Sequence, residues 1–327
     1  MSTRHEKDWD NYWQGRAAKA SGEALIGVGI ENNAKLSAFW TDLFKGLAPS
    51  ARIADFACGA GSALKHAHAA GLSELTGVDI AAQAIDVLKT AIPNVKGCVS
   101  PVDDTPFEAG CFDAVVSQFG FEYAGDGPSL LAAAQEMARV LAPGGTFTAI
   151  AHIQGGAIEQ ESAASLANID LVLESGFISS AQQMFKAVYT ADANPTAEHQ
   201  DRFRQALIVM NQAESQLVQW LKSPQAQGNE FARFGHYLVT STREMFARHS
   251  ELSLEDCLTW LDDMQAEILA YQGRMRNMVE AAISEIMAEN VLAVFSKAGF
   301  TVDNPEPFYF DPEDLPVAWV LRGEGKA

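Results

Sequence analysis

The sequence predicts an α/β protein in which helices cover both faces of a mostly parallel sheet and an all-helical block interrupts the fold late in the chain. Three observations predict it. Short apolar runs alternate with helical segments between residues 52 and 152, which is typical of a parallel sheet. Helical pattern then continues from about Ala157 to Phe295, far longer than an ordinary connection. Strand-like runs return after Gly299, so the helical block is an insertion rather than an appendage.

The alternating part of the chain yields its elements one by one. An amphipathic helix is expected from Lys35 to Leu47, and Pro49 helps to stop it. The elements expected after it are strand 52–57, helix 62–70, strand 75–80, helix 82–91, strand 95–99, strand 112–118, helix 129–141 and strand 145–152. Ligands of open parallel sheets bind at the carboxyl ends of the strands, so the residues that follow these strands are the candidate site.

The helical block is expected to form four or five helices, because residues that break helices recur along it. The breaks lie at Gly176, at 192–195, at 223–229 and at 249–250. After the block, a helix from Asn290 to Ala298 and apolar runs at 300–302, 308–310 and 317–321 are expected to return to the sheet. The block is interpreted either as a lid that lines a substrate pocket or as a dimerisation element.

Composition restricts the partners, because the 327 residues are 48% hydrophobic and carry a formal net charge of −19. Such acidity argues against a nucleic acid and against an anionic membrane surface, since both favour basic patches. No apolar run reaches the roughly 20 residues that span a bilayer, and the polar residues 1–14 do not resemble a secretory signal. The four cysteines form no CxxC pair, so we expect reduced thiols and no metal site. These observations favour a cytoplasmic protein with a small-molecule substrate, no nucleic acid and no membrane.

A glycine-rich turn follows the first expected strand. The apolar run ends at Asp55, Gly59 and Gly61 follow with one residue between them, and a helix begins. The glycines let the backbone come close to a nucleotide-like ligand, and Asp55 is placed to hold a cationic or amide group. A dinucleotide turn needs a third glycine three residues after the second, where this chain has Leu64. A NAD-type oxidoreductase is therefore the less favoured interpretation.

A second acid ends the next expected strand. Residues 74–80 have the pattern of a strand, and Asp79 lies at its carboxyl end. An acid in this position accepts hydrogen bonds from both hydroxyls of a ribose. The turn and this acid together predict a site for a nucleoside-containing cofactor.

Four segments in this order resemble the motifs of class I methyltransferases that depend on S-adenosyl-L-methionine (SAM). They are Asp55-x-x-Cys58-Gly59-x-Gly61, the strand that ends at Asp79, the strand introduced by Phe112-Asp113, and Pro143-Gly144-Gly145 with the strand after it. The resemblance implies a Rossmann-like fold with a seven-stranded, mostly parallel sheet. The core would be 49–156 and 290–327, with 1–48 as an N-terminal helical cap and 157–289 as the insertion. It also implies SAM as cofactor, S-adenosyl-L-homocysteine as product, and direct in-line transfer of the methyl group to a small-molecule acceptor.

The resemblance further assigns residues that contact SAM, with Asp79 as the ribose-binding acid. Pro101 stands where relatives have the Asp that binds adenine, so Asp103 or Asp104 would take over beside the Val102 amide. Tyr12 and Trp13 resemble cap residues whose aromatic faces attract the sulfonium, or they belong to an arm that only docks on the core. The full predicted set is Asp55, Ala57, Gly59, Gly61, Asp79, Ile80, Val102, Asp103, Gln118, Tyr12 and Trp13.

Candidate catalytic residues follow the fourth and fifth strands. Glu122 or Tyr123 is placed to accept a proton, and Gln118 to position the sulfonium or the substrate. His152, just after the fifth strand, is the best-placed histidine for a general base toward a substrate hydroxyl or amine. The alternatives are an exposed Glu122 and a His152 that only forms hydrogen bonds behind the site.

Substrate contacts are expected from Phe119 and from the helical block, where Arg233, His236 and Tyr237 lie within one or two turns of a helix. They would contact substrate if the block is a lid; a dimerisation element implies a homodimer instead. The alternative function is a regulatory protein of the same fold that binds SAM without transferring the methyl group. Turnover separates the two functions.

Overall fold

The computed structural model describes residues 34–125, 127–227 and 230–326. These residues divide into two compact units, and the chain passes between them at Ser162–Ala163 and at Arg276–Asn277. The first unit is an α/β domain, and the second is built from helices. Tyr12 and Trp13, the predicted cap residues, lie outside the described residues. Within the described ranges, every helix is too short or too polar to cross a membrane.

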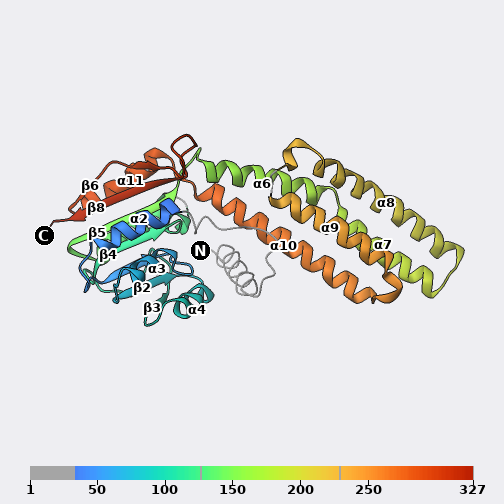
Figure 1. Cartoon of the computed structure of the whole chain (residues 1–327), viewed down its shortest axis with the longest axis horizontal. Helices are drawn as coiled ribbons and strands as arrows, with labels where there is room; N and C mark the ends of the chain where they lie inside the picture. Colours follow the sequence, from blue (N-terminus) through green and yellow to red (C-terminus); the bar gives the residue numbers. More distant parts are fainter. Residues whose placement is uncertain (1–33, 126, 228–229, 327) are drawn as a thin grey trace. The chain divides into compact units, whose positions relative to one another are not determined.

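An eight-stranded sheet forms the centre of the first unit (Figure 1). Its order is β3-β2-β1-β4-β5-β8-β6, with β7 beside β8. The parallel strands are β1 (Ile53–Phe56), β2 (Leu75–Asp79), β3 (Lys96–Val99), β4 (Phe112–Gln118) and β5 (Leu141–His152). The chain goes from β1 outward to β3 on one side, then returns to β4 on the other, so the order reverses between β1 and β4. Ligands of open α/β sheets bind in the crevice at such a reversal.

The sheet has one strand more than the seven that the sequence predicts, because two short strands share one edge of β8 (Ala318–Gly325). β6 (Phe300–Val302) pairs with the end of β8, and β7 (Glu306–Phe308) pairs with its beginning. Eight residues of β8 extend well past a three-residue partner, which leaves room for a second one. Pro307 lacks an N–H to donate and is therefore suited to an edge strand. The strand expected at 308–310 thus lies two residues earlier.

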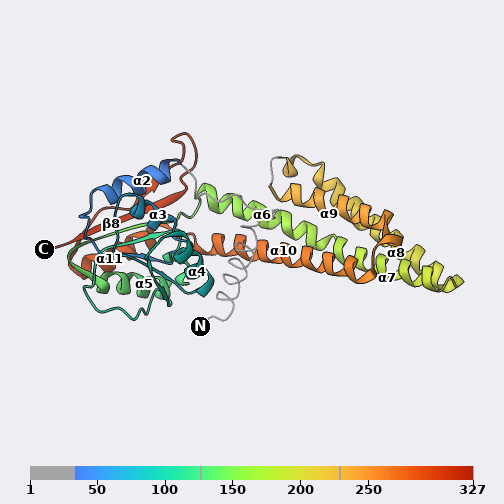
Figure 2. The same cartoon turned by 60° about the horizontal axis from the view of Figure 1, so that its bottom comes forward.

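Helices lie on both faces of the sheet (Figure 2), and apolar side chains pack against each face. On one face, α2 (Ala34–Lys45), α3 (Ser62–Ala69) and α4 (Ala82–Ala91) contribute to a cluster that includes Trp40 and Leu88. On the other face, α5 (Gly127–Val140) and α11 (Glu285–Lys297) contribute to a second cluster, in which Phe147 and Phe295 stack with ring centroids 3.5 Å apart. Burial on both faces fixes the strands, so their carboxyl ends present side chains at defined positions.

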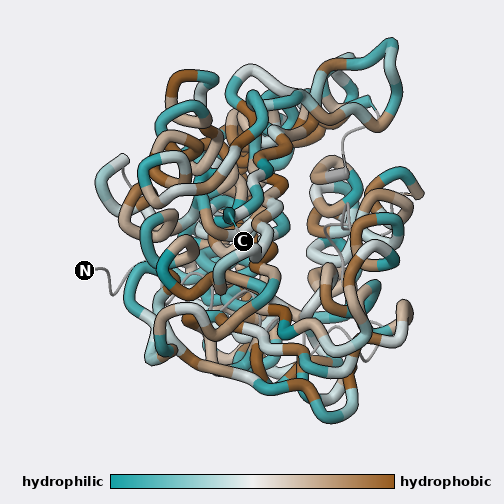
Figure 3. The backbone as a smooth tube through the Cα atoms, turned by 90° about the vertical axis from the view of Figure 1, so that its left-hand side faces the viewer, coloured by the Kyte–Doolittle hydropathy of each residue, from teal (hydrophilic) through white to brown (hydrophobic). Residues whose placement is uncertain are grey.

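Five helices contribute to the second unit among the described residues: α6 (Ala157–Glu174), α7 (Phe177–Ala193), α8 (Ala197–Leu221), α9 (Glu230–Ala247) and α10 (Leu254–Ala281). The helices end near the predicted breaks. Gly176 has the left-handed φ of 65° between α6 and α7, and Thr196 caps α8 by accepting a hydrogen bond from the His199 N–H. Hydrophobic and hydrophilic stretches alternate along the helices in Figure 3, as amphipathic helices require.

Candidate functional site

The glycine-rich turn between β1 and α3 is built from left-handed backbone. Ala57, Gly59 and Gly61 have φ values of 56°, 51° and 76°. A Cβ on Gly61 would overlap the Leu88 side chain of α4, so glycine is needed there both for its φ and for the close packing of α4. Ala57 takes the same backbone region with a side chain, a strained arrangement that is concentrated at functional sites. The turn therefore holds its backbone against the end of β1 and leaves little freedom to move.

Asp79, at the end of β2, ties this turn to the start of α4. Its Oδ2 accepts a hydrogen bond from the Gly59 N–H at 2.8 Å, and its Oδ1 accepts one from the Ala81 N–H at 2.9 Å. The side chain is mostly buried, with 8% of the residue exposed. A carboxylate only accepts hydrogen bonds, so its chemistry suits donors such as ribose hydroxyls. Asp79 thus fixes the turn and faces the same edge of the sheet.

Asp55 is a buried acid with an unpartnered oxygen. The residue is 1% exposed, and its Oδ1 has no hydrogen-bond partner. Burial raises the pKa of the Asp55 carboxyl well above its ordinary value, and the negative charge of Asp79 raises it further. A buried acceptor without a partner costs free energy in a folded protein, so its presence beside the glycine turn indicates a site for a donor group. A cationic or N–H group of a ligand fits that requirement.

The end of β4 is pressed against the glycine turn. Ser117 donates from its hydroxyl to the Phe56 carbonyl of β1 at 2.7 Å and accepts the Phe121 N–H at 3.0 Å. Phe119 has a positive φ of 50°, which turns the chain sharply into the short helix η2 (Phe121–Ala124). The contact is so close that a Cβ on Gly120 would lie 2.6 Å from the Ala57 carbonyl oxygen. The two loops that follow β1 and β4 therefore form one rigid edge.

Glu122 and His152 form a buried pair at this edge. The Nδ1 of His152 lies 2.7 Å from Oε1 of Glu122, and the same oxygen accepts the His152 backbone N–H at 3.0 Å. The two side chains are 2% and 0% exposed. Because β4 ends at Gln118, opposite Ile150, the N–H of His152 has no strand partner there and the carboxylate takes that place. The predicted catalytic residues Glu122 and His152 are thus brought into direct contact.

Aromatic rings and a backbone clamp hold His152 in place. Its ring lies 4.6 Å from that of Phe119 and 5.5 Å from that of Tyr123, between ring centroids. On the backbone, the Ile283 N–H donates to the His152 carbonyl at 2.9 Å, just after α10 ends. The predicted catalytic Tyr123 and the predicted substrate residue Phe119 therefore both pack on the same imidazole.

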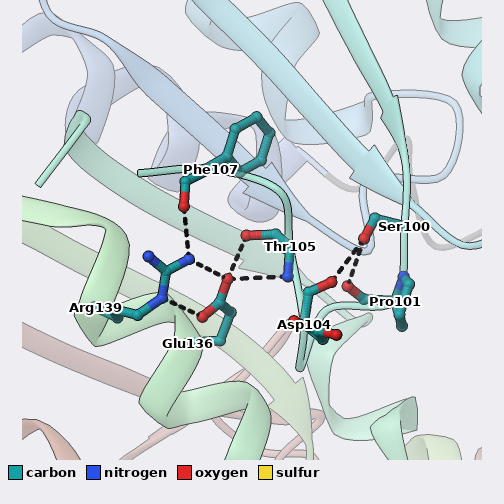
Figure 4. A network of polar contacts seen from close by, with 7 residues as sticks. All are labelled: Ser100, Pro101, Asp104, Thr105, Phe107, Glu136 and Arg139. Atoms are coloured by element: carbon teal, nitrogen blue, oxygen red, sulfur yellow. Dashed lines mark hydrogen bonds and ion pairs between the residues drawn. The ribbon is translucent and has the colours of Figure 1, made fainter. Parts of the chain in front are cut away.

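The loop after β3 is clamped to α5 by a polar network (Figure 4). Glu136 accepts the backbone N–H of Thr105 at 3.0 Å and the Thr105 hydroxyl, and it pairs with Arg139 at 2.6 Å. Arg139 also donates to the Phe107 carbonyl at 2.8 Å. The Ser100 hydroxyl bonds to the Asp104 carbonyl at 2.9 Å, which closes the other end of the loop. These contacts fix the stretch on which the adenine contacts were predicted.

Within this loop, Val102 is buried whereas Asp103 and Asp104 are exposed. Beside it, two apolar residues at strand ends remain exposed: Ile80 after β2 (39%) and Val99 at the end of β3 (55%). Asp79 and Val99 are partners in the register of β2 and β3, so these residues lie on neighbouring strand ends. An apolar pair next to Asp79, the predicted ribose-binding acid, suits one face of a flat aromatic ring.

Replacing Glu136 by Gln is expected to lower the free energy of unfolding at pH 7 by about 1–3 kcal/mol, because buried donors lose a charged acceptor. Burial raises the pKa of Glu136, but the hydrogen bonds from Arg139 and Thr105 outweigh it, so the pKa in the folded protein is below its ordinary value. The carboxylate therefore stabilises the fold above the unfolded-state pKa of about 4.3, and this contribution is lost as pH falls through the folded pKa.

Urea unfolding at pH 7 and at pH 4 measures this effect. The difference between the wild type and Glu136→Gln should shrink at the lower pH. Glu108→Gln, which removes an exposed carboxylate from the same segment, is the matched control and should change little. A difference for Glu136→Gln that stays constant with pH would contradict the assignment.

The structure places the predicted site residues in two groups. The first unit brings together the ends of β1, β2, β4 and β5, with Asp55, Ala57, Gly59, Asp79, Ile80, Gln118, Phe119, Glu122, Tyr123 and His152 at them. Gly61 begins α3 next to them. By contrast, Arg233, His236 and Tyr237 are exposed residues of α9 in the second unit. Their substrate role stays a prediction, and no cluster of candidate metal ligands occurs among the described residues.

Three residues of this edge were not singled out by the sequence: Ser117, Gly120 and Glu136. Ser117 and Gly120 act between strands that are 61 positions apart in the chain or more, so no local pattern marks them. For Glu136 a weak signal existed, since Arg139 follows it at the helical spacing of three residues.

Comparison with known proteins decides the family. The methyltransferase-domain family model matches residues 54–149, the segment that holds the glycine turn, Asp79 and the Glu122 side of the buried pair. Residues 54–149 belong to a SAM-dependent methyltransferase domain. The domain has SAM as its cofactor, and the acids and glycines described above fit it. No curated protein matches the chain.

Solved structures similar to this methyltransferase domain come from several organisms. A complex between the Haloferax volcanii Trm112 methyltransferase activator and a methyltransferase matches with 22% identity over 44% of this chain and 61% of the other, with a TM-score of 0.37. The geranyl diphosphate C-methyltransferase of Streptomyces coelicolor A3(2) matches with 22% identity over 47% and 67%, with a TM-score of 0.37. The sugar N-methyltransferase KedS8 of Streptoalloteichus matches with 23% identity over 45% and 54%, with a TM-score of 0.34. The first of these is matched over less than two thirds of its own length.

Proposed function

We propose that this protein is a cytoplasmic enzyme that transfers the methyl group of SAM to a small-molecule acceptor by direct in-line displacement. The observation that carries the proposal is the carboxyl edge of β1 and β2. There the unpartnered Oδ1 of Asp55, the left-handed glycine turn and the carboxylate of Asp79 lie on one edge within the matched methyltransferase segment. That combination offers a buried acceptor, close backbone and a ribose-binding acid, which is what a charged nucleoside requires.

The residues that would hold the cofactor follow from these positions. Asp79 would bind the ribose, Ile80 and Val99 would pack on the base, and Asp55 would face a cationic group. When bound, SAM supplies an electrophilic methyl group on a sulfonium that is already a good leaving group. The protein's task is then to hold the acceptor in line with that methyl group, and orientation alone contributes several kcal/mol to such reactions, up to about 10.

Charge supports a small-molecule acceptor. The chain carries a net charge of −19, and its 23 Lys and Arg residues form no basic tract that would follow a nucleic-acid backbone. The described cysteines are free thiols, which suits the reducing cytoplasm. A small substrate also suits the buried setting of Glu122 and His152, since an enclosed site excludes water from the reacting groups.

Calorimetric titration with S-adenosyl-L-homocysteine, run beside NAD and NADP, tests the cofactor assignment. Micromolar binding of S-adenosyl-L-homocysteine alone is the expected result. Binding of a nicotinamide cofactor would contradict the proposal and favour an oxidoreductase. Turnover is tested next with SAM and a panel of hydroxyl, amine and thiol acceptors. Binding without turnover on any of them would favour the non-catalytic regulatory alternative.

We further propose that the inserted helices, predicted as 157–289, form either a substrate lid or a dimer contact. Exposed apolar residues on α6 and α8 support the second possibility, because Leu171 and Ile208 are 52% and 50% exposed. Sedimentation of the full-length protein over a range of concentrations tests for a homodimer. A dimer that Ile208→Glu disrupts would support the contact, and a monomer at all concentrations would leave the lid.

A further inference from the structure

We propose that Glu122 and His152 act as a general-base dyad for the transfer, in which Nε2 of His152 takes a proton from the acceptor and Glu122 positions the imidazole. The inference rests on the proposed function and deepens it, because it names the acceptor class. An acceptor served by such a pair carries a removable proton on the atom that is methylated. It is therefore a hydroxyl compound or an amine.

The first step of the argument is the tautomer of His152. A carboxylate only accepts hydrogen bonds, so the 2.7 Å contact with Glu122 Oε1 requires the proton of the neutral imidazole to sit on Nδ1. The lone pair is then on Nε2. Among the described residues, nothing forms a hydrogen bond with His152 Nε2. The nitrogen that is able to accept a proton is thus the one without a hydrogen-bond partner in the described part of the chain.

The second step concerns the charge that appears when His152 takes up a proton. Glu122 is buried, and its Oε2 has no hydrogen-bond partner. Among the described residues, Glu122 forms the hydrogen bond to the imidazole, and the rings of Phe119 and Tyr123 lie against it. An ion pair in a dry environment stabilises an imidazolium far more than the same pair in water. If Glu122 only filled space, an apolar side chain would serve as well and would not leave a buried oxygen without a hydrogen bond.

The third step concerns rigidity. The His152 backbone is bonded to Glu122 on one side and to Ile283 on the other, and its ring lies between Phe119 and Tyr123. The sharp turn at Phe119, where φ is positive, brings that ring against the imidazole. These contacts fix the position of Nε2, and a general base needs a fixed position within hydrogen-bond reach of the proton that it takes. Both loops belong to the edge that also carries the cofactor residues.

The chemical step balances as follows. A lone pair on the acceptor oxygen or nitrogen forms the new bond to the methyl carbon, and the carbon–sulfur bond breaks with its electron pair remaining on sulfur. The acceptor's proton passes to Nε2 of His152, which becomes an imidazolium beside the Glu122 carboxylate and later releases the proton to water. A thiol needs such help much less, because its pKa of about 8.5 lets it ionise by itself near neutral pH.

The first test uses the free full-length protein and needs no acceptor. Nitrogen-15 NMR of histidine-labelled protein should show one ring with a stable Nδ1–H tautomer, and His152→Gln should remove that signal. Glu122→Gln should retain the ring signal but shift the tautomer toward Nε2–H. His68→Gln, an exposed residue of α3, is the matched control and should leave the signal in place. An Nε2–H tautomer in the wild type would overturn the proposal.

The second test distinguishes failure of the general-base dyad from failure of the proposed function. His152→Gln should bind S-adenosyl-L-homocysteine within about twofold of the wild type, yet lower kcat on a hydroxyl or amine acceptor by roughly 100-fold or more. Turnover of thiols alone, or unchanged kcat in His152→Gln, would overturn the proposed general-base dyad but leave the methyltransferase activity standing. Absent cofactor binding in the wild type would instead contradict the proposed function.

Discussion

Asp79→Ala is expected to weaken the binding of S-adenosyl-L-homocysteine by on the order of 100-fold, about 3 kcal/mol. The carboxylate has two tasks at once. It holds the glycine turn and the start of α4 by accepting the N–H groups of Gly59 and Ala81, and it is the group proposed to accept the ribose hydroxyls. Alanine removes the ribose acceptors and also leaves both backbone donors without their partner, so the turn loses its fixed position.

The measurement is calorimetric titration of both proteins under the same conditions. Asp86→Ala is the matched control, because Asp86 is an exposed acid on α4 and its loss changes the net charge equally. The control should bind as the wild type does. Equal affinities of Asp79→Ala and the wild type would show that the ligand does not use the end of β2, and the cofactor site would have to be sought elsewhere.

Gly120→Ala is expected to lower the free energy of unfolding by about 1–3 kcal/mol, as overpacking in a close-packed region does. Gly120 has a negative φ, so backbone strain is not the reason. The reason is contact: an added Cβ would lie 2.6 Å from the Ala57 carbonyl oxygen and 2.7 Å from the Ala57 Cβ. Both atoms are part of the glycine turn. This turn cannot move away from the added Cβ, because Asp79 holds Gly59 by a hydrogen bond.

Urea unfolding and cofactor titration together check this prediction. The variant should lose affinity for S-adenosyl-L-homocysteine as well as stability, because the clash displaces the turn that contacts the ligand. Gly127→Ala is a suitable control. A Cβ there would lie 3.0 Å from the flexible methyl end of Met287, and alanine favours the helix α5 in which it lies. A Gly120→Ala protein as stable as the control would mean that the two loops separate more easily than their packing indicates.

Much of the fold follows from local sequence signals. The first strand, the glycine turn and Asp79 were predicted because their pattern lies within a few residues, and the core elements begin and end close to the predicted positions. The strand count of seven was wrong by one, and the strand expected at 308–310 lies at 306–308, because its pairing depends on the length of β8. The apolar pattern placed this strand at 308–310, but pairing with β8 sets its bounds.

The site was predicted residue by residue, but its contacts were not. Glu122 and His152 were each proposed as a proton acceptor, whereas the structure joins them through two hydrogen bonds across 30 positions. The buried, unpartnered oxygen of Asp55 also required the structure, since exposure of a single atom is set by everything packed around it. In the second unit, the substrate role of the α9 residues stays a prediction.

Asp55 has a consequence for how the protein captures its cofactor. In the free protein burial favours the carboxylic acid form, since the pKa of Asp55 is raised. A cationic group that arrives at Oδ1 favours the carboxylate instead, so a proton held there leaves as the cation enters. Binding of the cofactor then exchanges a proton for the cationic group. The affinity for the cofactor should therefore increase as pH rises toward the pKa of Asp55. Titrations in buffers with different ionisation enthalpies would show heats that differ in proportion to the protons released, and Asp55→Asn should abolish the difference.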